Sequence, residues 1–151
     1  MSGRDVTRRC AISIDVDPIP CYYRIHALGP APSELRAAIM RRCVPRFAEV
    51  FARRGVRATF FVVAEDVDDA VLGDQAGPIR ALLRDLVAAG HEIASHSYSH
   101  PYELARLGRE RVAAELGRAH DLLSAACGRP VVGFRAPGYD LSATMLDRLI
   151  A

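Results

Sequence analysis

Short apolar runs alternate with helical stretches along the chain, and this alternation restricts the possible fold more than any other feature. The runs lie at residues 10–16, 57–63, 92–95 and 131–134. Strands that alternate with helices are typical of βα units, in which the strands form a parallel sheet. We therefore predict an α/β fold with four βα units.

Proline, serine and glycine divide the intervening stretches into helices. The sequence predicts helices over residues 33–55, 78–90 and 101–128, because a serine or proline opens each stretch and a glycine closes it. A break is expected at Gly108, and Pro45 is expected to kink the first helix.

Composition places the chain among globular proteins. It has 151 residues, of which 50% are hydrophobic, and its net charge is +2. This suits one folded domain, and the balanced charge argues against a nucleic-acid partner. No apolar run approaches the roughly 20 residues of a membrane span, and Arg8-Arg9 does not read as an export signal, so we predict a cytoplasmic protein. The oligomeric state stays open.

Four cysteines and an acidic cluster are given structural roles. The cysteines show no C-x-x-C spacing, so we expect reduced, buried thiols. The acids Glu65, Asp66, Asp68 and Asp69 follow the second strand, but they lack the glycine and late glutamate of a calcium loop. We expect a solvated loop or helix start there.

Two aspartates end the first strand. Apolar residues alternate with Ser13, Asp15 and Asp17, so a strand places both carboxylates on one face. Small residues followed by acids at the carboxyl end are typical of a barrel strand that carries a site at its mouth. Asp15 and Asp17 are therefore candidate site residues.

His96 and His100 follow the third strand. Both can face one metal ion if they lie on a helical turn, and Pro101 suits a helix that begins there. Two imidazoles and the Asp17 carboxylate would make the three protein ligands of a catalytic zinc site, leaving Asp15 as a base. The residues alone do not decide which aspartate has which role, and an isolated histidine pair at this spacing is more often structural.

A third candidate segment follows the fourth strand. Arg135 lies where its guanidinium can orient Asp15 bidentately, and a surface ion pair is the alternative. The Pro-Gly turn after it can present backbone N–H groups, including that of Tyr139, to a developing oxyanion.

Three segments resemble the first three motifs of the polysaccharide deacetylases, the carbohydrate esterase family with the NodB-homology domain. They are Ser13-Ile-Asp15-Val-Asp17-Pro18, His96-Ser-Tyr-Ser-His100 and Arg135-Ala-Pro-Gly-Tyr139. Residues 58–62 and 90–93 also resemble the family's second and third strands.

The resemblance implies a distorted (β/α) barrel, of which residues 1–151, as a single domain, would form about the first half. It implies hydrolysis of an N-acetyl or N-formyl group on a sugar or polysaccharide, with zinc or another divalent metal such as Co²⁺, Ni²⁺ or Mn²⁺. Residue by residue, it makes Asp15 the catalytic base, Arg135 the residue that positions this base, and Asp17, His96 and His100 the metal ligands.

Two departures from the family pattern leave the substrate open. Val16 separates two aspartates that are usually adjacent, a form similar to that of sugar deformylases and of peptidoglycan or imide-acting relatives. The later motifs, including the histidine that protonates the leaving amine, have no counterpart before Ala151, so we expect a C-terminally incomplete domain. The remaining histidines, which suit core or surface roles better, are His26, His91 and His120.

Two other functions stay open. The spaced aspartates are compatible with hydrolysis of a ureido or cyclic imide substrate on the same fold. The missing acid and strands are compatible with a non-catalytic remnant that binds metal or carbohydrate. For a sugar substrate, Tyr22 and Tyr23 in the connection after the first strand are candidate binding residues, although loop tyrosines more often pack against their own domain.

Overall fold

The computed structural model describes residues 10–150, and its strands form one parallel sheet. In sheet order the strands are β1 (Ser13–Val16), β2 (Thr59–Val62) and β3 (Glu92–Ser95). In this register Asp15 lies opposite Phe61, which in turn lies opposite Ala94. The carboxyl ends of the strands therefore meet at one edge of the sheet, and the predicted α/β class with a parallel sheet is confirmed.

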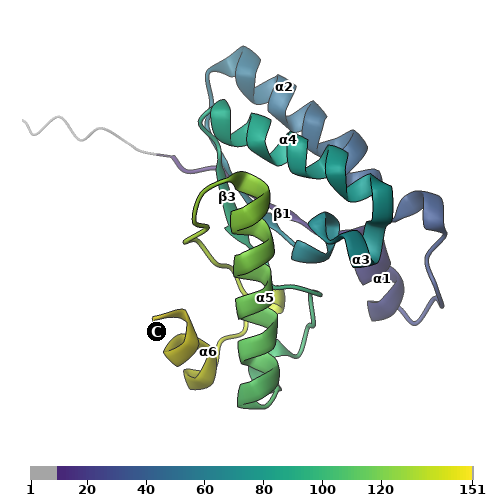
Figure 1. The fold of residues 1–151 in the computed structure, drawn as a ribbon, viewed down its shortest axis with the longest axis vertical. Helices are drawn as coiled ribbons and strands as arrows, with labels where there is room; N and C mark the ends of the chain where they lie inside the picture. Colours follow the sequence, from purple (N-terminus) through teal and green to yellow (C-terminus); the bar gives the residue numbers. More distant parts are fainter. Residues whose placement is uncertain (1–9, 151) are drawn as a thin grey trace, which may run out of the picture.

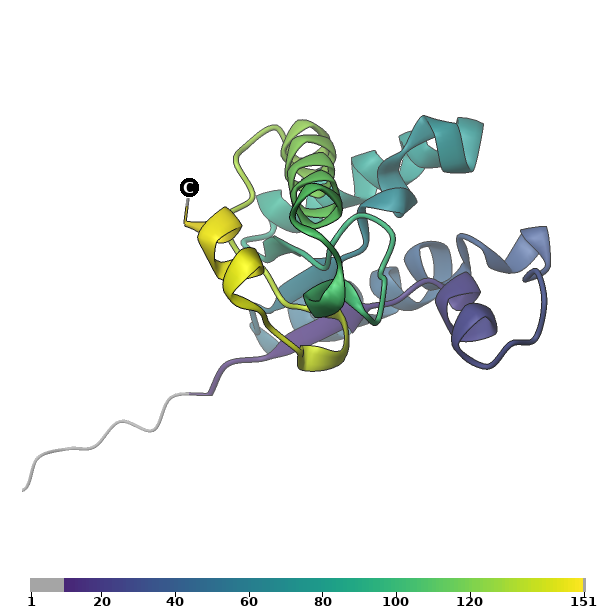
Figure 2. The same cartoon turned by 90° about the horizontal axis from the view of Figure 1, so that it is seen from below.

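Helices connect the strands and follow the last one. The α-helices are α1 (Ile19–Ile25), α2 (Val44–Arg54), α3 (Asp69–Leu72), α4 (Ala76–Ala88), α5 (Arg109–Cys127) and α6 (Ala143–Leu149). Turns of 3₁₀ helix lie at Ser33–Leu35, Ala64–Val67, Gly73–Gln75, Leu104–Arg106 and Pro137–Tyr139, and a π-helical turn lies at Ile39–Cys43. Figure 1 shows α2 and α4 side by side, and Figure 2 shows α6 beside α5.

Alternation along the strands gives the sheet a covered face and an open face. Val16, Phe60, Val62 and Ile93 belong to the buried core. The helices contribute Val44 and Phe51 of α2, Ile79, Leu83 and Leu86 of α4, and Ala119 and Leu123 of α5. Burial of these apolar side chains is the main favourable contribution to folding. Because successive strand residues point to opposite faces, the open face carries Ser13, Asp15, Thr59, Phe61 and Glu92.

Glycines end two of the helical regions as predicted. Gly55 follows α2 with φ 62° and Gly128 follows α5 with φ 68°, both in the left-handed region that glycine adopts without steric cost. The single helix predicted over residues 33–55 is wrong, because a 3₁₀ turn and a π-helical turn precede α2. Pro45 lies in the first turn of α2, where its missing N–H costs little, and the change of helix type comes directly before it.

The fourth strand predicted at residues 131–134 is wrong. Phe134 forms only a single bridge to Ser95 of β3. The Ser95 N–H donates to the Gly133 carbonyl at 2.8 Å, and the Arg135 N–H donates to the Ser95 carbonyl at 3.0 Å. Gly133 permits this approach, since a Cβ there would lie 2.9 Å from a side chain of β3. Two hydrogen bonds do not make a ladder, so the described sheet has three strands.

The acidic cluster after β2 contains the helix start that the sequence allowed, because α3 begins at Asp69, but it is partly buried and not a solvated loop. Asp66 is 2% exposed and Asp68 is 6% exposed. Asp68 caps α3 by accepting a hydrogen bond from the Ala70 N–H at 2.9 Å, and it also accepts one from Arg118 at 2.6 Å. Asp68 is thus tied to the fold, whereas Oδ2 of Asp66 is buried without a hydrogen-bond partner.

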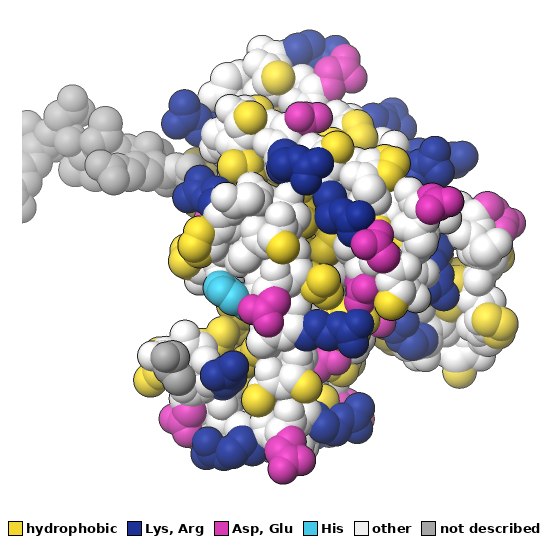
Figure 3. Space-filling model, in the orientation of Figure 1, with side chains coloured by type: hydrophobic (Ala, Val, Ile, Leu, Met, Phe, Trp, Pro, Cys, Tyr) yellow, Lys and Arg dark blue, Asp and Glu magenta, His cyan; other side chains and the backbone are white. Residues whose placement is uncertain are grey.

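The surface carries mixed charges, and the cysteines are free. Figure 3 shows arginine and acidic side chains interspersed on the displayed face. Cys21 and Cys127 are buried free thiols as predicted, whereas Cys10 is exposed. Across residues 10–150, no helix is long and apolar enough to cross a membrane. The arginine pair at residues 8 and 9 lies outside the described residues.

Asp66 should make the stability of the fold depend on pH. Burial first, and then the charge of Glu65, raises the pKa of Asp66 to about 8 against an opposing effect of Arg36. Because the folded state holds the proton more tightly, the contribution of Asp66 to stability is greatest below about pH 4 and is lost as the pH rises to about 8. We expect Asp66→Asn to remove this loss, so its advantage in free energy of unfolding grows from pH 5 to about pH 8.

Urea denaturation of both proteins at the two pH values measures this advantage. The control is Asp74→Asn, which changes an exposed aspartate and should give no pH-dependent difference. A difference between wild type and Asp66→Asn that stays constant with pH would contradict the prediction.

Candidate functional site

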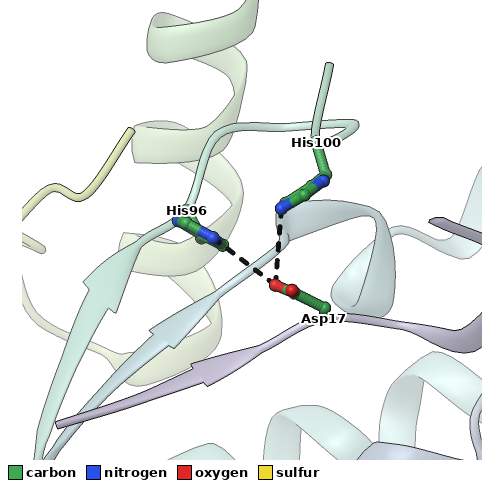
Figure 4. Close-up of side chains that lie close together, drawn as sticks. All are labelled: Asp17, His96 and His100. Carbon is green, nitrogen blue, oxygen red and sulfur yellow. Dashed lines mark ion pairs between the residues drawn. The ribbon is translucent and has the colours of Figure 1, made fainter. Parts of the chain in front are cut away.

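Three side chains from separate parts of the chain converge at the carboxyl edge of the sheet (Figure 4). Asp17 directly follows β1, and His96 directly follows β3. The Asp17 Oδ1 atom lies 3.4 Å from Nε2 of His96 and 3.4 Å from Nε2 of His100. The ligand atoms of the three residues all lie within 4.8 Å of one another. The structure therefore brings together the three residues that the sequence predicted as metal ligands.

A backbone carbonyl fixes the tautomer of His96. Its Nδ1 lies 2.8 Å from the carbonyl oxygen of Arg135. A carbonyl oxygen only accepts hydrogen bonds, so Nδ1 must carry a proton, and in the neutral imidazole Nε2 then presents a lone pair. This lone pair faces the Asp17 carboxylate, which is also an acceptor. A metal-ligating histidine has this same arrangement, with its second ring nitrogen bound to a carbonyl or carboxylate.

One atom of Asp17 and one of His100 are buried polar atoms. The Asp17 Oδ1 atom and the Nδ1 atom of His100 have no hydrogen-bond partner within the described residues. Burial lowers the pKa of His100, which favours the neutral imidazole, and the Asp17 charge opposes this shift. Buried polar atoms normally find a partner, and two nitrogen donors with one oxygen donor match the ligand types of zinc. The residues present therefore fit a divalent cation.

The loop that carries the histidines is not the helical turn predicted from their spacing. His96 and His100 are joined by irregular backbone, and the next helical turn begins only at Leu104. Ser97 has φ 68° and His100 has φ 56°, both in the left-handed region that non-glycine residues rarely adopt. The His100 N–H donates to Oγ of Ser97 at 3.1 Å. These reversals of the backbone bring both Nε2 atoms to Asp17.

Asp15 is held on both carboxylate oxygens. Nη1 of Arg135 donates to Oδ1 of Asp15, and the Tyr139 hydroxyl donates to Oδ2 at 3.0 Å. The bidentate pair predicted for Arg135 is wrong, because its Nη2 donates to Oγ of Ser13 at 2.8 Å instead. The guanidinium carbon also lies 4.0 Å from the centre of the Phe61 ring, which fixes its plane. Arg135 and Tyr139 together orient Asp15 beside the cluster.

Tyr139 contacts the site through its hydroxyl and not through its backbone. Its N–H donates to the Ala136 carbonyl at 3.0 Å within the turn, so the predicted oxyanion contact of this N–H is wrong here. The hydrogen bond to Asp15, followed by the charge of Asp15, raises the pKa of the Tyr139 hydroxyl. Because Tyr139 is 76% exposed, its ring is open to a ligand.

Tyr22 and Tyr23 lie on α1 and not in an irregular loop. The Tyr22 hydroxyl donates to Oδ2 of Asp17 at 3.3 Å, and its side chain is 46% exposed. Burial, followed by the charge of Asp17, raises the pKa of Tyr22. Tyr23 is half-buried. Tyr22 thus contacts the candidate ligand set directly, a position that the sequence did not indicate.

The other histidines of the described residues do not belong to the cluster. Nδ1 of the buried His91 accepts a hydrogen bond from the Ala58 N–H at 3.1 Å. His120 is exposed, with Nδ1 3.1 Å from the Val131 carbonyl, and His26 follows the end of α1.

Glu115 of α5 is a residue that sequence reasoning missed: it binds the loop between His96 and His100, and no local motif marks it.

Comparison with known proteins gives the family. A sequence model described as polysaccharide deacetylase matches residues 31–150. The chain belongs to the polysaccharide deacetylase family. The match begins after β1, so Asp15 and Asp17 lie before it, whereas both candidate histidines lie within it.

Relatives of this deacetylase-family chain include a chitooligosaccharide deacetylase of Sinorhizobium fredii. It is 35% identical over 94 residues, which are 62% of this chain and 39% of the relative. The structure also resembles a family 4 carbohydrate esterase of Streptomyces lividans in complex with acetate (TM-score 0.65, 22% identity, 95% of this chain and 58% of that chain). A family 4 acetyl xylan esterase of Clostridium thermocellum with a cobalt ion is similar (TM-score 0.65, 22% identity, 91% and 53%).

The chain matches only part of the length of each of these proteins. The chain spans less than two fifths of the length of the chitooligosaccharide deacetylases that it matches and a little over half of the two esterase structures. At 22% identity the esterase structures establish the shared fold.

Proposed function

We propose that this chain carries the catalytic residues of a metal-dependent hydrolase that removes an N-acetyl or N-formyl group from a sugar or polysaccharide. The observation that carries the proposal is the convergence of Asp17, His96 and His100 beside an aspartate held by Arg135. The names of the chitooligosaccharide deacetylase relatives and the acetate and cobalt in the esterase structures support it.

Asp17, His96 and His100 would hold the metal through one oxygen and two nitrogen atoms. This donor set suits Zn²⁺ and also Co²⁺, Ni²⁺ or Mn²⁺. Such a cation supplies Lewis-acid chemistry, in which it polarises the acyl carbonyl oxygen and lowers the pKa of a water. The Tyr22 hydroxyl donates to the second oxygen of Asp17, which would leave the first oxygen available to the cation.

Asp15 is the proposed base. It accepts a proton as the attacking water oxygen bonds to the acyl carbon, and the carbon–nitrogen bond then breaks to release a carboxylate and the sugar amine, which takes a proton. Arg135 and Tyr139 keep the carboxylate oriented for this transfer, because each holds one of its oxygens. Within residues 10–150 no other histidine belongs to this cluster, so the proposal assigns no histidine to protonation of the amine.

The sheet would be part of a distorted (β/α) barrel, and residues 1–151 would belong to a single deacetylase-type domain. Its parallel strands and the coverage of the esterase structures support this proposal.

Two other functions have a specific observation in their favour. Val16 separates Asp15 from Asp17, a spacing that resembles imide- or ureido-acting relatives of the family, so a cyclic imide or ureido substrate is the second candidate. The unassigned proton donor favours a protein that binds metal or carbohydrate without turnover. Release of acetate from N-acetylchitooligosaccharides would support deacetylation, and ring opening of cyclic imides would support the second candidate. Metal or sugar binding with neither reaction would support the non-catalytic candidate.

Zinc binding should require Asp17. Titration of the metal-free protein with Zn²⁺ against a chromophoric chelator is expected to give one tight site. Asp17→Asn should abolish tight binding, because an amide oxygen replaces the only anionic ligand. Asp74→Asn, at an exposed aspartate outside the site, should bind zinc like the wild type. Equal affinity in Asp17→Asn would contradict the proposed ligand set.

Asp15 should be needed for turnover and not for metal binding. We expect Asp15→Asn to lower kcat for N-acetylchitooligosaccharides by roughly 10²–10⁴-fold, as for loss of a general base. Its zinc affinity should stay within the range of the wild type. Loss of zinc together with activity would instead place Asp15 among the ligands, and wild-type turnover would remove it from the mechanism.

Tyr22 should contribute through its ring to sugar binding. Tyr22→Ala is expected to weaken the binding of an N-acetylchitooligosaccharide severalfold, since aromatic faces stack on sugar rings. Tyr22→Phe keeps the ring and should retain sugar affinity. The melting temperature should change little because the side chain is half-exposed. Calorimetric titration measures the affinities, and a large fall in melting temperature for Tyr22→Ala would indicate a packing role instead.

A further inference from the structure

Glu115 lies on α5 with its carboxylate against the loop between the two candidate histidine ligands. Oε2 accepts hydrogen bonds from the Tyr98 N–H at 3.1 Å and the Ser99 N–H at 2.9 Å. Oε1 accepts one from the Ser99 hydroxyl at 2.7 Å. One side chain therefore satisfies two successive backbone donors and a hydroxyl of the same loop.

The loop has a backbone that needs such support. Ser97 and His100, on either side of the two bound residues, have positive φ angles. Non-glycine residues stay in this region only where the surrounding structure holds them there. Glu115 contacts the segment between the two strained residues, so it restrains the path of the chain into His100.

Other segments hold the carbonyls of the same loop. The Ala64 N–H donates to the Ser97 carbonyl at 3.1 Å, and the Glu65 N–H donates to the Tyr98 carbonyl at 3.0 Å. Arg24 donates to the Ser99 carbonyl at 2.7 Å. The N–H groups of Tyr98 and Ser99 still need an acceptor, and the carboxylate of Glu115 on α5 provides it.

A second residue of α5 holds the side chain of Tyr98. Arg118, three residues after Glu115 and on the same side of the helix, lies 4.1 Å from the centre of the Tyr98 ring. It also donates to Asp68, which accepts from the Tyr98 hydroxyl at 2.9 Å. Two residues of helix α5 therefore contact the loop: Glu115 binds the loop's backbone, and Arg118 packs on the Tyr98 ring.

We propose that Glu115 is a positioning residue of the metal site. It holds Tyr98 and Ser99 so that Nε2 of His100 faces the Asp17 carboxylate together with Nε2 of His96. This inference rests on the proposed metal function. A carboxylate is required because the three groups that contact Glu115, two backbone N–H groups and one hydroxyl, are all hydrogen-bond donors. A glutamine of the same shape would have one oxygen for them and would turn an amide NH₂ toward the loop.

The test compares Zn²⁺ affinity in Glu115→Gln and in Glu110→Gln. Glu110 is an exposed glutamate in the first turn of the same helix. We expect Glu115→Gln to raise the dissociation constant for zinc about 10- to 100-fold, as for loss of a group that orients a metal ligand. The control should bind like the wild type. In the metal-free protein, Glu115→Gln should lower the melting temperature by a few degrees, because it loses contacts to one loop, and Glu110→Gln should not change it.

Each outcome supports or overturns the inference. Wild-type zinc affinity in Glu115→Gln overturns it while leaving the proposed function intact. If the core variant Ile79→Val, which should lower the metal-free melting temperature to a similar extent, weakens zinc binding as much as Glu115→Gln, the inference is also overturned, because the effect is then general destabilisation. Absence of zinc binding in the wild type overturns both the inference and the proposed function.

A second variant covers the case in which Glu115→Gln does not fold. Ser99→Ala removes only the hydroxyl contact to Oε1 and keeps both backbone contacts. It should raise the zinc dissociation constant severalfold with the metal-free melting temperature retained. An unchanged dissociation constant in Ser99→Ala would overturn the proposal.

Discussion

Parallel pairing of β1 with β2 and of β2 with β3 is the constraint on which the site depends. It aligns the carboxyl ends of three strands at one edge, so Asp17 and His96 meet although they are far apart in the sequence. The same alternation buries Phe60 and Val62 against the helices and leaves Phe61 on the open face under Arg135. A one-residue slip would exchange the core and site faces together, so packing and chemistry are fixed by one register.

The segment after the bridge to β3 links the proposed base to the proposed ligands. The Arg135 carbonyl fixes the tautomer of His96, while the Arg135 side chain holds Asp15. A displacement of this backbone would therefore change the ligand set and the base at once. Gly133 makes the arrangement possible, because a side chain there would collide with β3 and push the segment away. The two halves of the proposed chemistry are thus coupled through one short stretch of chain.

Helix α5 has two roles at successive positions along its length. Ala119 and Leu123 pack into the core beneath the sheet, whereas Glu115 and Arg118 contact the histidine loop. Core packing therefore sets the position of the helix, and the helix in turn sets the strained path of the loop into His100. Stability of the core and geometry of the proposed metal site depend on the same element.

The sequence alone determined the α/β class, the three strands of the sheet and the residues that gather at their ends, because hydrophobic periodicity and the placement of acids and histidines are local signals. It did not determine that residues 131–134 form only a bridge, that Asp66 is buried, or that Arg135 divides its donors between Asp15 and Ser13. Only the tertiary structure decided these points and the role of Glu115, since each depends on atoms from distant segments whose approach leaves no local pattern in the chain.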